Sequence, residues 1–202
     1  MPAAERYDLA SAIDRWVVGN FLAWLGDYSR RQGGALGSYS INLSAASIGE
    51  ESFLDFVLAA IERHGVPAQL ICFEITETSA IANLNKAIVF MQRLKDIGCQ
   101  FALDDFGSGL SSFAYLKSLP VDFLKIDGVF VKDIVADPIA RAMVASINTI
   151  GHEMGLQTVA EFVETEAILD QLRELGVDYA QGYFLGHPQP LSELDGVRMM
   201  PR

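Results

Sequence analysis

Residues 100–107 read Gln-Phe-Ala-Leu-Asp-Asp-Phe-Gly, a short apolar run that stops at two aspartates, Asp104 and Asp105. A brief apolar run between polar residues and glycine is typical of a buried strand. Five further segments have the same character, and each has a polar or ionisable side chain near its carboxyl end. We therefore predict six strands, at residues 38–43, 70–75, 101–103, 121–126, 158–160 and 179–183.

Helical periodicity fills the intervals between these strands, with apolar residues three or four positions apart. We expect Ser79 to be an N-cap, Gly98 to follow a helix end, and Asp137 to cap a helix that starts at Pro138. The strand–helix alternation predicts a parallel α/β fold, and the lack of a linker-like segment favours one domain over residues 1–202. The predicted helices span residues 8–31, 47–64, 79–97, 138–154 and 165–175.

Two architectures fit this alternation, an open doubly wound sheet and a (β/α) barrel. Strand side chains alternate between faces, so a polar residue between apolar neighbours, such as Glu74 or Lys125, faces away from the helices. In a barrel, inward residues at the carboxyl ends of all strands converge on one face. In an open sheet they gather only near a switch point. Because all six strands contribute polar residues, we predict a barrel.

The polar residues at the strand ends point to a metal site when they are taken together, although each alone is more often a cap or a solvated turn. Four carboxylates at one place would repel one another strongly, and Lys125 cannot offset all of them. Carboxylates and an amide carbonyl are hard oxygen ligands that suit Mg²⁺, Mn²⁺ or Ca²⁺. A bridging carboxylate such as Asp104 suits a pair of ions, as in two-metal phosphoesterases. The predicted oxygen donors are Asn42, Glu74, Asp104, Asp105 and Glu161.

Composition argues against several other functions. The 202 residues include 15 Lys and Arg against 26 Asp and Glu, and the net charge of −11 disfavours a nucleic-acid polymer as partner. The glycine-containing stretch at residues 106–109 lacks both a third glycine and a P-loop lysine, so a flexible loop over the metals is favoured over a nucleotide loop. Two unpatterned cysteines, Cys72 and Cys99, and the lack of a secretory or membrane-spanning apolar run favour the cytoplasm.

These stretches resemble the EAL-domain family, bacterial phosphodiesterases that hydrolyse cyclic di-GMP to linear pGpG. The resemblance runs in the family's order from residue 2 to about residue 191, and it implies a modified TIM barrel whose first strand is antiparallel to the others. The matching segments are Asn42-Leu43-Ser44, Glu74-Ile75-Thr76-Glu77, Asp104-Asp105-Phe106-Gly107-Ser108-Gly109, Leu124-Lys125-Ile126-Asp127, Glu161-Phe162-Val163-Glu164, and Gln181-Gly182-Tyr183 followed by Gly186-His187-Pro188.

The resemblance implies two divalent cations, Mg²⁺ or Mn²⁺, with Ca²⁺ inhibitory. Asn42, Glu74 and Asp104 would hold the first cation, with Asp104 shared between the two. Asp105 and Glu161 would hold the second.

The resemblance also implies roles in catalysis and in substrate binding. Glu161 would act as the base that activates water, and Lys125 would lie beside that water and the phosphate. Glu77 would tether the loop that follows the third strand, and Glu164 and Gln181 would support substrate or water binding.

The chain departs from the family pattern at its start. Residues 1–202 contain neither the Glu-Ala-Leu motif, whose glutamate is a further metal ligand, nor the arginine that follows it and contacts substrate phosphate. Residues 2–7 align downstream of that motif, so we expect a TIM-like barrel of the EAL type that lacks its first two strands and is incomplete, with about six strands. Phe162 also replaces the usual glycine, Ser108 a threonine and Leu110 an aromatic residue.

The resemblance therefore implies a cyclic di-GMP phosphodiesterase, and the missing Glu-Ala-Leu strand implies that residues 1–202 alone are weak or inactive. The alternative is a degenerate, non-catalytic EAL module that binds cyclic di-GMP or a protein partner. A sugar-metabolising barrel enzyme is a third interpretation, but it explains Asp104-Asp105 less well. We expect a homodimer, and an upstream sensory or GGDEF domain in a longer protein that is cytoplasmic or the cytoplasmic part of a membrane-anchored protein.

Overall fold

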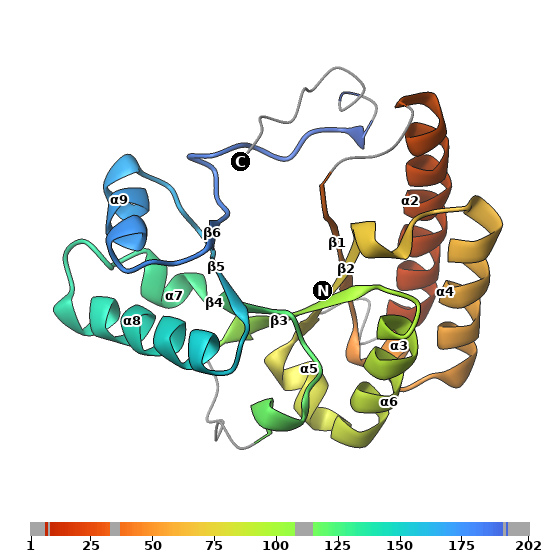
Figure 1. The fold of residues 1–202 in the computed structure, drawn as a ribbon, viewed down its shortest axis with the longest axis horizontal. Coiled ribbons are helices and arrows are strands. Elements are labelled where there is room, and N and C mark those ends of the chain that lie inside the picture. Colours follow the sequence, from red (N-terminus) through yellow and green to blue (C-terminus); the bar gives the residue numbers. More distant parts are fainter. Residues whose placement is uncertain (1–6, 8, 33–36, 108–114, 192, 194–202) are drawn as a thin grey trace. The chain divides into compact units, whose positions relative to one another are not determined.

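The computed structural model describes Tyr7 and residues 9–32, 37–107, 115–191 and 193 (Figure 1). The chain divides into two compact units. The first comprises residues 1–75, 79–101 and 190–202, and the second comprises residues 76–78 and 102–189. No helix in the described ranges has both the length and the hydropathy needed to cross a bilayer.

The first unit is built on two parallel strands, in which Asn42 of one strand lies opposite Glu74 of the other. The five residues from Ile71 to Ile75 of the second strand are all buried. Since successive side chains point to opposite faces, this strand is covered on both faces. The elements of this unit are α2 (Ala10–Gln32), β1 (Tyr39–Leu43), α3 (Ala45–Ile48), α4 (Glu51–His64), the 3₁₀ turn η1 (Ala68–Leu70), β2 (Ile71–Thr76), most of α5 (Glu77–Ala82), and α6 (Leu84–Lys95).

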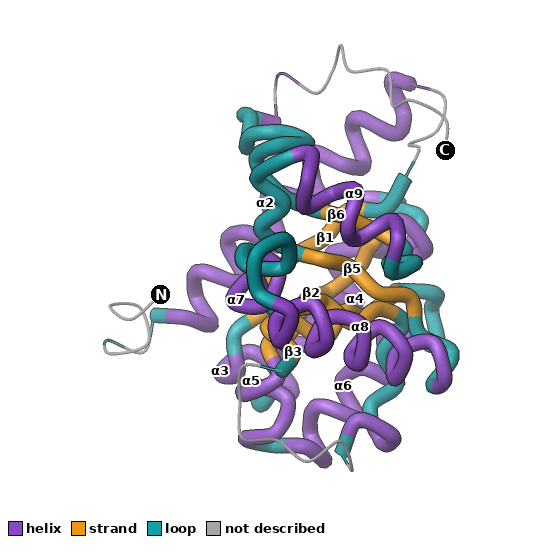
Figure 2. The backbone as a smooth tube through the Cα atoms, turned by 90° about the vertical axis from the view of Figure 1, so that its left-hand side faces the viewer, coloured by secondary structure: helices purple, strands orange, loops and turns teal. Residues whose placement is uncertain are grey.

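The second unit has four strands, paired in parallel in chain order. Helix α8 packs against β4 and β5, and Figure 2 shows α8 beside β5. The elements of this unit are most of β3 (Gln100–Phe106), the 3₁₀ turn η2 (Leu116–Ser118), β4 (Phe123–Ile126), α7 (Gly128–Val131), α8 (Pro138–Glu153), β5 (Gln157–Ala160), α9 (Glu166–Glu174) and β6 (Tyr179–Ala180). The predicted parallel α/β fold is therefore confirmed within both units.

Two predicted helices are each divided in two. The helix expected over residues 47–64 is interrupted at Gly49, where α3 ends, and α4 begins at Glu51. Ser44 caps the short α3 by accepting a hydrogen bond from the Ser47 N–H. The helix expected over residues 79–97 already begins at Glu77 and breaks at Asn83, whose backbone is not helical (φ −149°). Ser79 therefore lies inside α5, and its prediction as an N-cap is wrong.

Other predicted ends are correct because the residue chemistry there is local. Gly98 has φ +105°, and the Asp137 side chain accepts a hydrogen bond from the Ile139 N–H at the start of α8.

The predicted lengths of two strands were wrong. The strand expected to stop before Asp104 continues to Phe106, and the last strand covers only residues 179–180. Gln181 thus lies just beyond β6 rather than within it.

Candidate functional site

The carboxyl ends of β3, β4 and β5 bring together the charged residues of the second unit. Along β3 and β4, Leu103 pairs with Leu124 and Phe106 pairs with Ile126. Ile126 pairs in turn with Ala160 at the end of β5. This register places Lys125 between the aspartates of β3 on one side and Glu161, which follows Ala160, on the other.

An irregularity in β3 explains how two consecutive aspartates reach the same place. Alternation along a regular strand would send Asp104 and Asp105 to opposite faces. Here the register shifts between Leu103 and Phe106, so that both aspartates lie opposite Lys125 alone. Asp105 has φ +55°, a left-handed conformation that aspartate tolerates better than most residues. An extra residue in one strand of a pair redirects side chains in this way.

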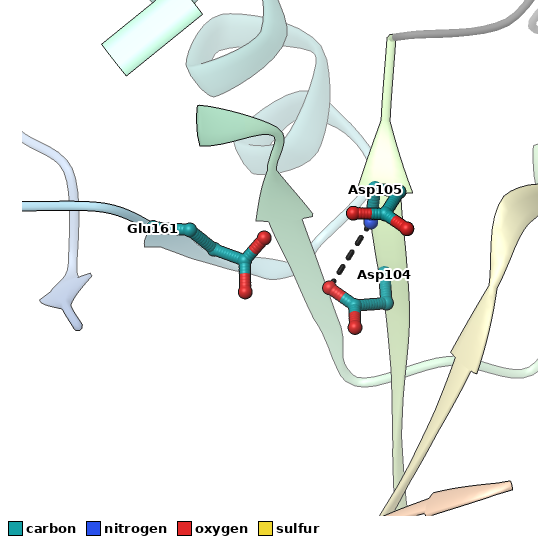
Figure 3. Close-up of side chains that lie close together, drawn as sticks. All are labelled: Asp104, Asp105 and Glu161. Carbon is teal, nitrogen blue, oxygen red and sulfur yellow. Dashed lines mark hydrogen bonds between the residues drawn. The ribbon is translucent and has the colours of Figure 1, made fainter. Parts of the chain in front are cut away.

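The three carboxylates of the second unit form a compact cluster. Asp104, Asp105 and Glu161 each offer one oxygen, and these oxygens all lie within 4.8 Å of one another. Figure 3 shows the two aspartates extending from one strand, with the Glu161 carboxylate pointing toward them. Asp104 Oδ1 also accepts a hydrogen bond from the Asp105 backbone N–H at 3.0 Å.

Lys125 is the cation within this cluster. Its ammonium lies 2.9 Å from Asp104 Oδ1 and 2.8 Å from Glu161 Oε1, and its side chain is almost fully buried. One ammonium among three carboxylates leaves an excess of negative charge. Burial, with repulsion from Asp104 and Asp127, raises the pKa of Asp105 above its ordinary value, although Lys125 opposes this. Burial also raises the pKa of Glu161 against the opposing effect of Lys125.

Glu77 contacts both flanks of residues 108–114, which lie outside the described part of the chain. Its Oε2 accepts a hydrogen bond from the Gly107 N–H at 3.3 Å, and its Oε1 accepts one from the Tyr115 hydroxyl. Glu77 is itself buried, at 3% exposure. The residue therefore connects the end of β3 to the segment that precedes η2. The expected glycine loop over the metals, with Ser108 and Gly109, falls on the undescribed residues.

A pocket of about 270 Å³ opens beside the carboxylate cluster. Two of its lining residues, Glu164 and Gln181, are the predicted substrate-binding residues. Two aromatic residues, Phe162 and Tyr183, also line it, and their side chains are largely exposed. Sequence reasoning assigned no binding role to Tyr183, although it lies in the motif Gln181-Gly182-Tyr183. Tyr115 was likewise missed, because its partner Glu77 is 38 positions away.

The two remaining predicted metal ligands belong to the first unit. Asn42 is exposed and Glu74 is buried, and they lie opposite each other at the carboxyl ends of β1 and β2. Their mutual proximity follows from this register. Their convergence on the Asp104 cluster of the second unit stays a prediction.

Comparison with known proteins matches almost the whole chain. The sequence profile described as the EAL domain matches residues 1–188. The cyclic di-GMP phosphodiesterase PdeB of Shewanella oneidensis is 44% identical over 191 residues, which cover 94% of this chain and 22% of that protein. The cyclic di-GMP phosphodiesterase PdeF of Escherichia coli is 37% identical over 202 residues, covering 98% of this chain and 27% of PdeF. The chain thus spans about a quarter of the length of these relatives.

Solved structures of EAL-type proteins also match almost the whole chain. The PaMucR phosphodiesterase in complex with c-di-GMP matches with a TM-score of 0.88 and 34% identity, over 96% of this chain and 78% of that one. The EAL domain of Mycobacterium smegmatis DcpA matches with a TM-score of 0.83 and 33% identity, over 93% of this chain and 84% of that domain. The predicted fold class, a TIM-like α/β barrel of the EAL type with six strands present, is confirmed for the described residues.

Proposed function

As the chain belongs to the EAL-domain family, we propose that its function is the metal-dependent hydrolysis of cyclic di-GMP to linear pGpG. The observation that carries this proposal is the cluster of Asp104, Asp105 and Glu161 around the buried ammonium of Lys125. The names of the curated relatives support cyclic di-GMP as the substrate.

The donor set of the second unit fits divalent cations. All three clustered groups are carboxylates, the ligands that Mg²⁺ and Mn²⁺ prefer. Burial and, to a lesser degree, repulsion from neighbouring carboxylates raise the pKa values of Asp105 and Glu161, and bound cations would offset both effects. We propose that Asp105 and Glu161 hold one cation, that Asn42 and Glu74 hold the other, and that Asp104 is shared. Ca²⁺ would bind the same oxygens without supporting hydrolysis.

The residues of the chain have distinct tasks in this proposal. Bound divalent cations would supply a water of lowered pKa and would neutralise phosphodiester charge. The Glu161 carboxylate accepts the proton of the attacking water, and the Lys125 ammonium, held at 2.8 Å from Glu161 Oε1, stabilises charge that develops on the phosphate. Glu164 and Gln181 contact the substrate from the wall of the adjacent pocket.

Residues 1–202 lack two parts of this machinery, the Glu-Ala-Leu motif and the phosphate-contacting arginine that follows it in the family. Residues 1–202 contain no Glu-Ala-Leu sequence, and in the family the glutamate of that motif is a further metal ligand. We therefore expect weak or absent turnover by residues 1–202 alone. The test is chromatographic detection of pGpG after incubation of cyclic di-GMP with Mn²⁺ or Mg²⁺. It compares the chain alone with the chain joined at its N-terminus to the Glu-Ala-Leu segment of an EAL relative.

The second candidate is a non-catalytic module that binds cyclic di-GMP or a protein partner. One observation favours it: Phe162, at the position of the usual glycine, exposes 48% of its surface immediately after Glu161 and lines the pocket. Calorimetry with cyclic di-GMP in Ca²⁺ separates the two candidates. Tight binding without pGpG release in Mn²⁺, even with the Glu-Ala-Leu segment attached, supports the module.

An exposed apolar surface on the second unit supports a homodimer. Ile139 and Met143 lie one turn apart on α8 and are 74% and 40% exposed, and Val135 before the helix is 55% exposed. Contiguous exposed apolar surface marks protein–protein interfaces, and we propose that these three residues contribute to one. Sedimentation velocity tests this: Ile139→Glu should convert a dimer into a monomer.

We also propose an upstream sensory or GGDEF domain, since the relatives are about four times as long as the chain. We further propose a cytoplasmic location.

A further inference from the structure

Phe162 has a backbone conformation that bulky residues rarely adopt. Its φ is +55°, in the left-handed region that suits glycine. Among the described residues, the only other non-glycine residue with positive φ is Asp105, whose side chain is better suited to that conformation. Because Phe162 directly follows Glu161, its φ sets the direction in which the chain leaves that residue. A conformation of this kind persists where the surroundings hold it in place.

The Phe162 ring is held by the segment that follows β4. A Cβ atom built on Gly128 would lie 2.1 Å from Phe162 Cδ2 and 2.6 Å from its Cγ. The ring therefore lies directly against the Gly128 backbone, at a distance that any other residue would prevent. The Lys132 ammonium lies 4.1 Å from the centroid of the ring, within the range of a cation–π interaction. Gly128, the residue that the ring contacts, lies three positions after Lys125 in the chain.

The turn that carries Glu161 and Phe162 is also fixed by its backbone. The Glu161 N–H donates to the Ile126 carbonyl at 3.3 Å, and the Val163 N–H donates to the Gln181 carbonyl at 3.0 Å. On the far side, a Cβ on Gly182 would lie 2.3 Å from Val163 N and O. The turn thus fits closely between two glycines, and its side toward β4 is closed by the Phe162 ring.

We propose that Phe162 is a positioning residue for Glu161, which it holds against Lys125 through the contact of its ring with Gly128. This inference rests on the proposed function, because it concerns the metal-holding role of Glu161. Glycine at position 162 would adopt the same φ without strain but would make no contact with Gly128. The Glu161 carboxylate would then be less fixed relative to Lys125 and the two aspartates, and it would bind a cation less tightly. Partners that orient a metal ligand typically affect metal affinity by about 10-fold to 100-fold.

The test is titration calorimetry of the 202-residue chain with Mn²⁺, combined with urea unfolding in EDTA. We expect Phe162→Gly to weaken Mn²⁺ binding about tenfold or more, while its unfolding midpoint without metal stays at or above that of the wild type, because glycine relieves the strain. The matched control, Phe162→Tyr, keeps the ring and should bind Mn²⁺ like the wild type. Phe162→Gly with unchanged Mn²⁺ affinity overturns the inference. A wild-type chain that binds no Mn²⁺, even when it is joined to the Glu-Ala-Leu segment, overturns the proposed function, and with it the role of Phe162.

A double-mutant cycle tests the contact itself. Gly128→Ala in the wild-type chain should displace the Phe162 ring, lowering both the Mn²⁺ affinity and the unfolding midpoint. In the Phe162→Gly background the same substitution should be harmless, because no ring lies against position 128. Equal effects of Gly128→Ala in the two backgrounds would show that the ring contact does not position Glu161, and would overturn the inference.

Discussion

The Lys125 ammonium lies 2.8 Å from Glu161 Oε1, and both side chains are largely buried. The same ammonium lies 2.9 Å from Asp104 Oδ1. Lys125 therefore bridges a carboxylate of β3 and the carboxylate of the residue that follows β5, and removing it would leave both carboxylates buried without their cation. Breaking a buried ion pair in this way typically costs about 3–5 kcal/mol.

We expect Lys125→Met to destabilise the metal-free chain by several kcal/mol and to lower hydrolysis at least about 100-fold, because a charge-stabilising donor is lost at the reacting phosphate. Urea unfolding and pGpG release measure the two effects. Lys117→Met is the matched control, since Lys117 is an exposed lysine in the same unit. Similar losses in both variants would show that the effect is not specific to the cluster.

Divalent cations should stabilise the folded chain through Asp104. A ligand that binds only the folded state raises stability by an amount that grows with its concentration relative to Kd, about 2.7 kcal/mol at 100 times Kd. We expect Mn²⁺ to raise the thermal midpoint of the wild type and to leave that of Asp104→Asn nearly unchanged. Asp133→Asn, an exposed site in the same unit, should respond like the wild type. An undiminished response in Asp104→Asn would remove this residue from the metal site.

Glu77→Gln should lower turnover with little effect on the affinity for cyclic di-GMP. The substitution weakens the acceptor that receives hydrogen bonds from the Gly107 N–H and the Tyr115 hydroxyl. The chain between those contacts directly follows the strand that ends in Asp104, Asp105 and Phe106. Comparison of kcat with the dissociation constant in Ca²⁺ separates the two effects. If Tyr115→Phe leaves kcat unchanged while Glu77→Gln lowers it, the hydroxyl contact is not part of the tether.

Asp178 should stabilise the second unit in a pH-dependent way. Burial acts to raise its pKa, but hydrogen bonds from the Thr158 backbone N–H, His152 and the Thr158 hydroxyl outweigh this and lower the pKa below the ordinary value. A carboxyl group whose pKa is lowered in the folded state stabilises the fold fully at pH values above its unfolded-state pKa of about 3.9. This contribution is lost as the pH falls through the folded-state pKa. Asp178→Asn should therefore be less stable than the wild type at pH 6, with the difference disappearing toward pH 2. A difference that stays constant over this range would contradict the shift.

Much of the fold was predictable because its determinants are local. The glycine at position 98 and the Asp137–Pro138 pair mark helix ends through their own backbone chemistry, and the structure confirms both. The alternation of strands and helices likewise predicted parallel pairing. The breaks at Gly49 and Asn83 were missed because the apolar periodicity continues across them.

The candidate site was predictable in its residues but not in its geometry. Strand alternation alone separates Asp104 from Asp105, and only the register shift against β4, a property of two strands together, brings both to one place. The replacement of glycine by Phe162 was visible in the sequence. Its positive φ and its contact with Gly128, 34 positions earlier in the chain, depend on how the ends of β4 and β5 pack.

The central claim is metal-dependent hydrolysis at the cluster of Asp104, Asp105 and Glu161. The most direct measurement is pGpG release from cyclic di-GMP by the chain joined to a Glu-Ala-Leu segment, in Mn²⁺ and in EDTA, with Glu161→Ala measured in parallel. We predict pGpG with Mn²⁺, none in EDTA, and a Glu161→Ala variant that still binds cyclic di-GMP but does not cleave it. The absence of pGpG in Mn²⁺, or equal cleavage by Glu161→Ala, would contradict the claim.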